Sequence, residues 1–127
     1  MENLNLARSK STPEVAFDAA AGIMAMTGES YPENSFEYYR PLLVWLQQYL
    51  PTASVPLTFN FNLSYLNTGS TKSVMDILDL LEDAYEGGKV VQVNWYYDAE
   101  NDRALSNAEE FREEVRVPFR ILPLSGR

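Results

Sequence analysis

The sequence predicts a mixed α/β fold, in which a mixed β-sheet of about five strands carries about three helices, mainly on one face. The chain has 127 residues, of which 46% are hydrophobic and 13% aromatic, so it can build the core of one ordinary domain. Residues 57–65 alternate strictly between apolar and polar side chains, as a strand with one buried face does. Residues 72–86 repeat apolar side chains every three or four positions, as an amphipathic helix does. We therefore expect a single domain over residues 1–127.

The first part of the chain predicts a β-hairpin after a polar N-terminal segment, residues 1–10. Residues 14–18 alternate between apolar and polar side chains, and residues 23–27 form a second candidate strand. A turn at Ala21-Gly22 separates the two strands, so they can pair directly. We assign residues 28–34 to a loop.

A helix is predicted from about Ser35 to Leu50. Ser35 is a suitable N-cap, and Pro51 ends the helix. Pro41 lies inside this pattern, where it either kinks the helix or marks the first turn of a helix that starts later. The apolar positions expected to face the core are Phe36, Tyr39, Leu43, Leu46 and Leu50.

Strands and helices alternate through the rest of the chain. A tight polar turn over residues 67–71 leads from the strand at 57–65 into the helix at 72–86, which Gly87-Gly88 ends. The helix is long enough for a right-handed parallel crossover to the next strand. The remaining elements are a strand at 89–97, an acidic turn at 98–102, a short helix at 106–115 with capping-box spacing between Ser106 and Glu109, and a strand through Val117, Phe119 and Ile121.

Both central strands carry one polar face. A sheet covered by helices on both faces shows continuous apolar runs instead. We therefore place the helices on one side of the sheet and expect Asn60, Asn62, Gln92 and Asn94 to lie near solvent or a partner.

The residue types that are missing exclude several classes of function. The chain has no Cys and no His, so it has no disulfide, no thiolate nucleophile and no Ser-His-Asp arrangement, and we expect no metal site and no cofactor. Ten Lys and Arg against 18 Asp and Glu give a net charge of −8, which opposes nucleic-acid binding. A binding module is therefore favoured over an enzyme.

The sequence also indicates a cytoplasmic protein that does not insert into a membrane. Its N-terminus has no apolar core of signal-peptide length. No stretch approaches the roughly 20 apolar residues of a membrane helix.

The polar turn before the helix at 72–86 is the strongest candidate site. The hydroxyls of Thr68, Ser70 and Thr71 cluster there with Lys72. Free N–H groups and the partial positive charge of a helix start would stabilise a phosphate on one of these hydroxyls by about 1–2 kcal/mol. Capping of the helix by Ser and Thr explains the same residue types without any modification. A nucleotide-binding P-loop is excluded, because Thr71 stands where that loop has a Gly before its Lys.

Two acidic segments have simpler interpretations than a metal site. Asp76, Asp79, Asp83 and Glu86 lie along the outside of the predicted helix, which indicates a solvated face. Residues 98–102 start like a calcium loop, but they lack its Gly and its closing Glu, so we interpret them as a turn.

Four runs, spread over roughly residues 10–122, resemble the SiaC family of bacterial regulatory phosphoproteins. They occur in order along nearly the whole chain, which makes the resemblance specific. The runs are STPEVAFD at 11–18, GESYPEN at 28–34, NFNLSYLNT at 60–68 and VNWYY at 93–97.

The resemblance implies a fold similar to the STAS domain of anti-sigma-factor antagonists, and a role in partner switching. A protein kinase phosphorylates a threonine in this family, and a PP2C-type phosphatase removes the phosphate. The unmodified form binds and activates a diguanylate cyclase, and so controls cyclic-di-GMP, biofilm formation and aggregation. The phosphorylated threonine of the family falls on Thr68 of this sequence.

On this interpretation the protein is a non-enzymatic phospho-switch, and the kinase supplies the ATP and magnesium. The other residues of the turn shape the surface that is presented to the kinase, phosphatase and cyclase. Two positions of the following helix are assigned to the cyclase interface only because they lie next to this turn. The turn residues are Asn67, Gly69, Ser70, Thr71 and Lys72, and the added positions are Met75 and Asp79.

Two alternatives remain open from the sequence. One is a small-molecule binding module or a weak carboxylate-based enzyme on the polar sheet face, around Asn60, Asn62, Asn94 and Tyr96. The other is a structural interaction domain that carries no modification.

Overall fold

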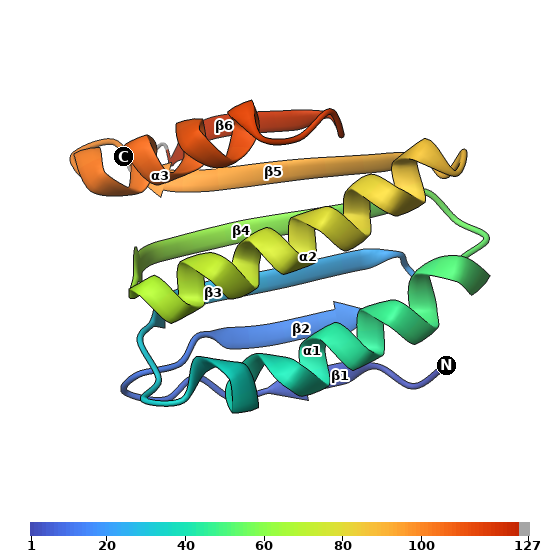
Figure 1. The fold of residues 1–127 in the computed structure, drawn as a ribbon, viewed down its shortest axis with the longest axis horizontal. Helices are drawn as coiled ribbons and strands as arrows, with labels where there is room; N and C mark the ends of the chain where they lie inside the picture. The colour runs from blue at the N-terminus through green and yellow to red at the C-terminus, as the bar shows by residue number, and fades with distance from the viewer. Residues whose placement is uncertain (125–127) are drawn as a thin grey trace.

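A computed structural model describes residues 1–124, in which three helices lie on one face of a six-stranded sheet (Figure 1). The strands are β1 (Leu4–Leu6), β2 (Glu14–Asp18), β3 (Ile23–Ser30), β4 (Leu57–Leu66), β5 (Val91–Asp98) and β6 (Phe119–Leu124). The helices are α1 (Ser35–Tyr49), α2 (Thr68–Glu86) and α3 (Asp102–Glu113), and a short 3-10 helix, η1 (Leu50–Thr52), follows α1. The predicted mixed sheet with helices on one side is confirmed.

The strands lie in the sheet in the order of the chain, from β1 to β6. The pairs β1–β2 and β2–β3 are antiparallel, which confirms the predicted hairpin. The pairs β3–β4, β4–β5 and β5–β6 are parallel, and each of these connections contains one helix. All three helices therefore start at the same edge of the sheet, where β3, β4 and β5 end.

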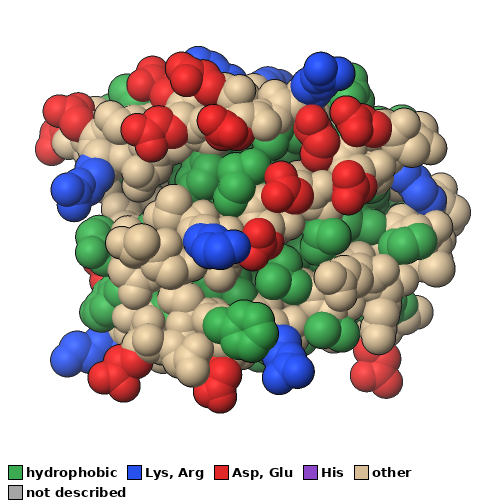
Figure 2. Space-filling model, in the orientation of Figure 1, with side chains coloured by type: hydrophobic (Ala, Val, Ile, Leu, Met, Phe, Trp, Pro, Cys, Tyr) green, Lys and Arg blue, Asp and Glu red, His purple; other side chains and the backbone are tan. Residues whose placement is uncertain are grey.

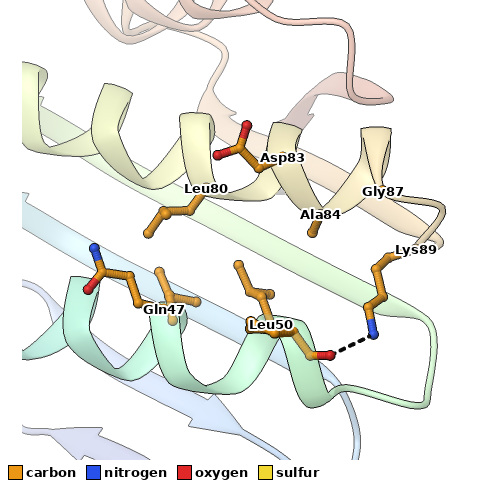
Figure 3. Close-up of a pocket in the computed structure, with 9 residues that line it drawn as sticks. Gln47, Leu50, Leu80, Asp83, Ala84, Gly87 and Lys89 are labelled. Carbon is orange, nitrogen blue, oxygen red and sulfur yellow. Dashed lines mark hydrogen bonds between the residues drawn. The ribbon is translucent and has the colours of Figure 1, made fainter.

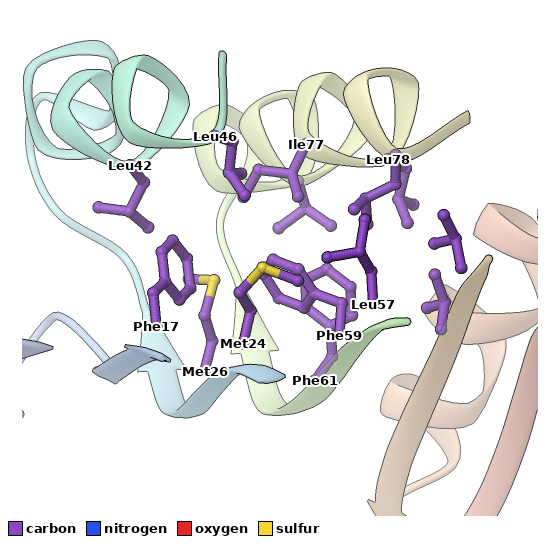
Figure 4. Close-up of a cluster of buried hydrophobic side chains, with 14 of the residues drawn as sticks. Phe17, Met24, Met26, Leu42, Leu46, Leu57, Phe59, Phe61, Ile77 and Leu78 are labelled. Carbon is purple, nitrogen blue, oxygen red and sulfur yellow. The ribbon is translucent and has the colours of Figure 1, made fainter. Parts of the chain in front are cut away.

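The core lies between the sheet and the helices and contains a row of aromatic rings (Figure 4). Phe17 contacts Phe59 with 5.5 Å between ring centroids, and Phe59 stacks on Phe61 at 4.3 Å. Phe61 stacks in turn on Trp95 at 4.9 Å, and Trp95 contacts Phe111 of α3 at 5.3 Å. This row crosses the sheet from β2 to β5, so it joins the hairpin to the parallel strands.

The helices begin earlier than the sequence predicts, because asparagine side chains cap them. The Asn67 side chain accepts the Ser70 N–H at 2.9 Å, so α2 starts at Thr68 instead of Lys72. Asn101 caps α3 in the same way, so that helix starts at Asp102 instead of Ser106. The cap of α1 is Asn34 instead of Ser35: its Oδ1 accepts the N–H of Glu37 at 3.1 Å. The predicted turn at 67–71 is therefore the first helical turn.

The buried stripe of α1 overlaps the predicted one only in part: Tyr39 and Leu46 are buried as predicted, and so is Leu50 at the start of η1. Pro41 lies inside the helix, so the helix does not start at that residue. Phe36, a predicted core residue, is 72% exposed, and Leu43 is half-buried. The buried positions of α1 are Tyr39, Leu42, Trp45, Leu46 and Tyr49.

Several strands also differ from the prediction, and β5 runs from Val91 to Asp98 instead of over 89–97. The polar N-terminal segment contains β1, a sixth strand that pairs Leu4 with Phe17. Strand β3 runs to Ser30 instead of ending before Gly28, whose φ of 132° favours glycine. The pairing of β3 with β4 shifts register between Gly28 and Glu29, and Tyr65 beyond the shift is 39% exposed instead of buried. Strand β6 starts at Phe119 instead of Val117.

The sheet face opposite the helices carries a ladder of polar side chains. The Asn94 Nδ2 donates to Asn60 Oδ1 at 2.9 Å. The Asn94 Oδ1 accepts from Arg120 Nε at 3.2 Å and from Gln92 Nε2 at 3.3 Å. Asn60, Asn62 and Gln92 are half-exposed as predicted, whereas Asn94 is only 5% exposed and bonds within the ladder. Within residues 1–124, no helix has the length and apolar composition to cross a membrane.

We expect Phe61→Ala to lower the free energy of unfolding by about 3–5 kcal/mol, because it leaves a cavity between two stacked rings. Urea unfolding followed by tryptophan fluorescence measures this change. The matched control is Phe36→Ala, which removes an exposed ring and should change stability by no more than about 0.5 kcal/mol. Equal stability of the two variants would contradict a core centred on the aromatic row.

Candidate functional site

The candidate site lies at the centre of the edge where the parallel strands end. Thr68 is the first residue of α2 and follows the end of β4 after one residue, Asn67. Its side chain is exposed. In α/β folds, groups at this edge of a sheet are the ones most often used for binding.

Asn67 fixes the start of α2 through its backbone and its side chain. Its Oδ1 accepts the N–H of Ser70 at 2.9 Å, and its Nδ2 donates to the carbonyl of Pro32 at 3.2 Å. Its backbone N–H donates to the carbonyl of Ser30 at 3.0 Å, and its carbonyl accepts the Thr71 hydroxyl at 3.1 Å. The position of Thr68 is therefore tied to β3 and to the segment that leads into α1.

Ser70 is buried, contrary to its predicted place on a partner-facing turn. Its Oγ lies 2.7 Å from the Ser30 Oγ, which lies 2.7 Å from the Tyr39 hydroxyl. These three residues have no exposed surface, and the hydrogen bonds satisfy their hydroxyls. Burial raises the pKa of the Tyr39 phenol, so the group stays neutral and can share its proton within the cluster. Ser70 thus joins α2 to β3 and α1, and no partner can reach it.

Gly69 lets the first turns of α1 and α2 touch. A Cβ atom at Gly69 would lie 2.6 Å from the Ser35 Oγ and 2.9 Å from the Ser35 Cβ, closer than real Cβ contacts. Gly69 is half-buried by this contact. The sequence predicts Gly69 as part of a turn presented to partners, and gives no sign of its contact with Ser35.

The other predicted residues of the site lie on the outer face of α2. Thr71 and Lys72 are exposed, and Lys72 Nζ lies 3.9 Å from an Asp76 oxygen. This ion pair is weak, because the Lys72 side chain is 81% exposed. Met75 is half-buried and packs against the core, whereas Asp79 is exposed. The predicted residues therefore follow one stripe of α2, with Ser70 excluded.

A shallow cavity of about 350 Å³ adjoins this stripe, between α2 and α3. Thr71 and Met75 line it from α2, and Phe111 lies at its side from α3. Its remaining lining residues are the glutamates Glu110, Glu113 and Glu114.

Negative charge dominates α2 beyond its first turns. Partial desolvation, and then the charges of Asp76 and Asp83, raise the pKa of the Asp79 carboxyl above its ordinary value. No group of three or more Asp and Glu residues in the described chain is arranged to hold a metal ion. The solvated acidic face that the sequence indicated is confirmed in position: Asp79 and Asp83 are exposed.

A second hollow lies at the far end of the helix pair, between the C-terminal halves of α1 and α2 (Figure 3). Leu50 points into it from the start of η1, directly after α1, and Leu80 and Ala84 face it from α2. Lys89 closes its end by donating to the carbonyls of Pro51 and Ala53, at 3.3 and 2.6 Å. This hollow is separate from Thr68, which starts the opposite end of α2.

Comparisons with known proteins agree over nearly the whole chain. A family model described as SiaC family regulatory phosphoprotein matches residues 6–124. An uncharacterized protein of Pseudomonas aeruginosa (strain UCBPP-PA14) is 45% identical over 121 residues, which is 95% of this chain and 96% of that protein. The structure of SiaC of Pseudomonas aeruginosa superposes with a TM-score of 0.91 at 43% identity, over 98% of this chain and 100% of that chain.

A further solved structure contains a partner protein. It is the crystal structure of the diguanylate cyclase SiaD in complex with its activator SiaC, from Pseudomonas aeruginosa. The matching chain superposes with a TM-score of 0.91 at 44% identity, over 95% of this chain and 99% of that chain.

We expect Gly69→Ala to destabilise the protein by about 1–3 kcal/mol, because the new methyl group must separate the first turns of α1 and α2. Ser35→Gly removes both atoms that the methyl group would meet, so the double variant should recover most of the loss. Urea unfolding of the two single variants and the double variant measures the coupling. Additive losses in the double variant would show that the contact with Ser35 does not determine the cost.

Proposed function

Because the chain belongs to the SiaC family of regulatory phosphoproteins, we propose that it activates a diguanylate cyclase and that phosphorylation of Thr68 controls this activation. The support for the first part is the solved complex in which a chain of 44% identity is the activator of such a cyclase. On this proposal the protein controls cyclic-di-GMP, and through it biofilm formation and aggregation. It is not itself an enzyme, and its likeness to the STAS fold stays a prediction.

The accessibility of Thr68 is the observation that supports it as the phosphate acceptor. Its side chain is exposed at the first position of α2. The neighbouring hydroxyls are engaged elsewhere, because Ser70 is buried against Ser30 and Thr71 donates to the carbonyl of Asn67. A kinase can therefore bind the Thr68 hydroxyl without breaking either of these hydrogen bonds, unlike the hydroxyls of Ser70 and Thr71.

A phosphate at this position would act through its charge. It adds about −1.5 to −2 charges to the surface, next to the free N–H groups of the first turn of α2. An interface that covers Thr68 would have to remove water from this charge, which costs free energy unless the partner compensates it. The unmodified form is then the form that docks, and the phosphorylated form is released.

The partners supply the chemistry that this chain lacks. A protein kinase brings ATP and magnesium, and a PP2C-type phosphatase removes the phosphate, so the chain needs no cofactor of its own. A supply of ATP for the kinase makes the cytoplasm the expected compartment. The residues proposed to meet these partners are the exposed or half-exposed ones of the α2 stripe: Asn67, Gly69, Thr71, Lys72, Met75 and Asp79.

The polar sheet face does not supply an equally good site. Its central amides, those of Asn60, Gln92 and Asn94, bond to one another. They therefore have less free hydrogen-bonding capacity for a ligand, and we do not propose a small-molecule site or a carboxylate-based enzyme there.

We expect Thr68→Ala to abolish phosphorylation by the kinase encoded in the same organism. Intact mass spectrometry after incubation with the purified kinase and ATP detects the added phosphate. The matched control is Ser106→Ala, which removes an exposed hydroxyl on α3, away from the turn, and should leave the phosphate in place. Phosphate on the Thr68→Ala protein would refute this acceptor.

We expect the unmodified protein and Thr68→Ala to activate the purified diguanylate cyclase, and we expect Thr68→Asp and the phosphorylated protein to activate it less. A tenfold rise in the concentration needed for half-maximal activation corresponds to about 1.4 kcal/mol of lost binding. Synthesis of cyclic-di-GMP as a function of added protein is the measurement. Ser106→Asp adds the same charge to an exposed site on α3 and should have no effect. Full activation by phosphorylated protein would show that charge at Thr68 is not the switch.

A further inference from the structure

Phe36, in the first turn of α1, has the largest exposed fraction of the large hydrophobic side chains in residues 1–124. It is 72% exposed, whereas Tyr65 and Tyr85, the other aromatic residues in this group, are 39% and 38% exposed. An exposed ring of this size gains little from folding, and aromatic residues are enriched among those that anchor protein interfaces.

Phe36 lies beside the phosphate acceptor because the first turns of two helices touch. Ser35 precedes Phe36 and meets Gly69, and Gly69 follows Thr68. Both Phe36 and Thr68 are exposed, in the adjoining first turns of α1 and α2. In Figure 1 these two helix starts lie at the same end of the helix layer.

This surface carries positive charge beside the ring. The Arg40 Cζ lies 5.9 Å from the centroid of the Phe36 ring, in a cation–π arrangement. Among residues 1–124, Arg40 forms no ion pair. Lys72, one helical turn after Thr68, is 81% exposed and pairs only weakly with Asp76, at 3.9 Å. The one carboxylate in the same turn of α1, that of Glu37, accepts a hydrogen bond from Asn34.

The rest of the helix layer has the opposite charge. Figure 2 shows Asp and Glu side chains gathered over the upper half of this face, with Lys and Arg at its edges. The exposed acidic residues on α2 and α3 include Asp79, Asp83, Glu86, Glu110, Glu113 and Glu114. The cations near Thr68 therefore stand out against the −8 net charge of the chain.

We propose that Phe36 and Arg40 form the second half of the surface that docks the partner at Thr68, a step that rests on the proposed function. The occupant that fits is a protein surface with an apolar pocket for the Phe36 ring and a carboxylate beside it for Arg40 and Lys72. Charge complementarity selects this occupant over a basic one. A phosphate on Thr68 then places a competing anion next to the same cations and repels the partner's carboxylate.

The test measures activation of the purified diguanylate cyclase by variants of the unphosphorylated protein. Phe36→Ala and Arg40→Glu should each raise the concentration for half-maximal activation at least about tenfold. Phe36→Tyr keeps the ring and should stay within about twofold of the wild type. Tyr85→Ala and Arg112→Glu are the matched controls, since they change an exposed aromatic and an exposed arginine elsewhere, and they should also stay within about twofold.

The outcomes separate this inference from the proposed function. If the wild type activates the cyclase and Phe36→Ala and Arg40→Glu do so equally well, the docking surface is wrong and the proposed function stands. If the wild type does not activate the cyclase, both are wrong. Phosphorylation of each variant by the kinase and its urea unfolding midpoint report on folding. Should Phe36→Ala lower that midpoint, Arg40→Glu against Arg112→Glu decides the result.

Discussion

Asn67 is the residue on which the geometry of the candidate site depends. Its backbone N–H and its side-chain amide bond to Ser30 and Pro32, on the segment that joins β3 to α1. Its side-chain oxygen and its carbonyl bond to Ser70 and Thr71, in the first turn of α2. One residue thus ends the central strand, caps the helix and attaches both to a neighbouring strand. Thr68 follows it directly, so this proposed acceptor is held on a fixed support instead of a free loop.

The buried hydroxyls and the glycine contact extend that support to α1. Ser70 reaches Ser30 and Tyr39 under the surface, and Gly69 meets Ser35 closer to it. The first turns of α1 and α2 are therefore joined both below and beside Thr68. A partner that docks here meets two helices in a fixed relation, which lowers the entropy lost on binding.

The sequence predicted the repeating elements well and the joints between them poorly. The alternation of β4 and the stripe of α2 come from burial on one face, and this signal is visible in a single segment. The start of α2 at Thr68 depended on Asn67 acting as a cap, but asparagine is equally common in turns. Ser70 could not be recognised as buried, because its partners come from β3 and α1. Phe36 was assigned to the core because it has helical spacing from Tyr39 and Leu46. These two residues fit both the predicted stripe and the buried one, so the spacing alone did not distinguish them.

The register shift between β3 and β4 has a consequence for the direction in which α2 leaves the sheet. Gly28 pairs with Leu63 and Glu29 with Tyr65, so Ser64 is an extra residue on β4. One extra residue reverses the alternation of side chains, which turns Tyr65 outward and Leu66 toward the helices. The bulge therefore lets the end of β4 direct different side chains toward the helices from those that the alternation in its middle, set by the aromatic core, would direct there. The aromatic core and the turn that carries Thr68 can therefore each keep its own orientation, because Ser64 between them has no pairing partner on β3.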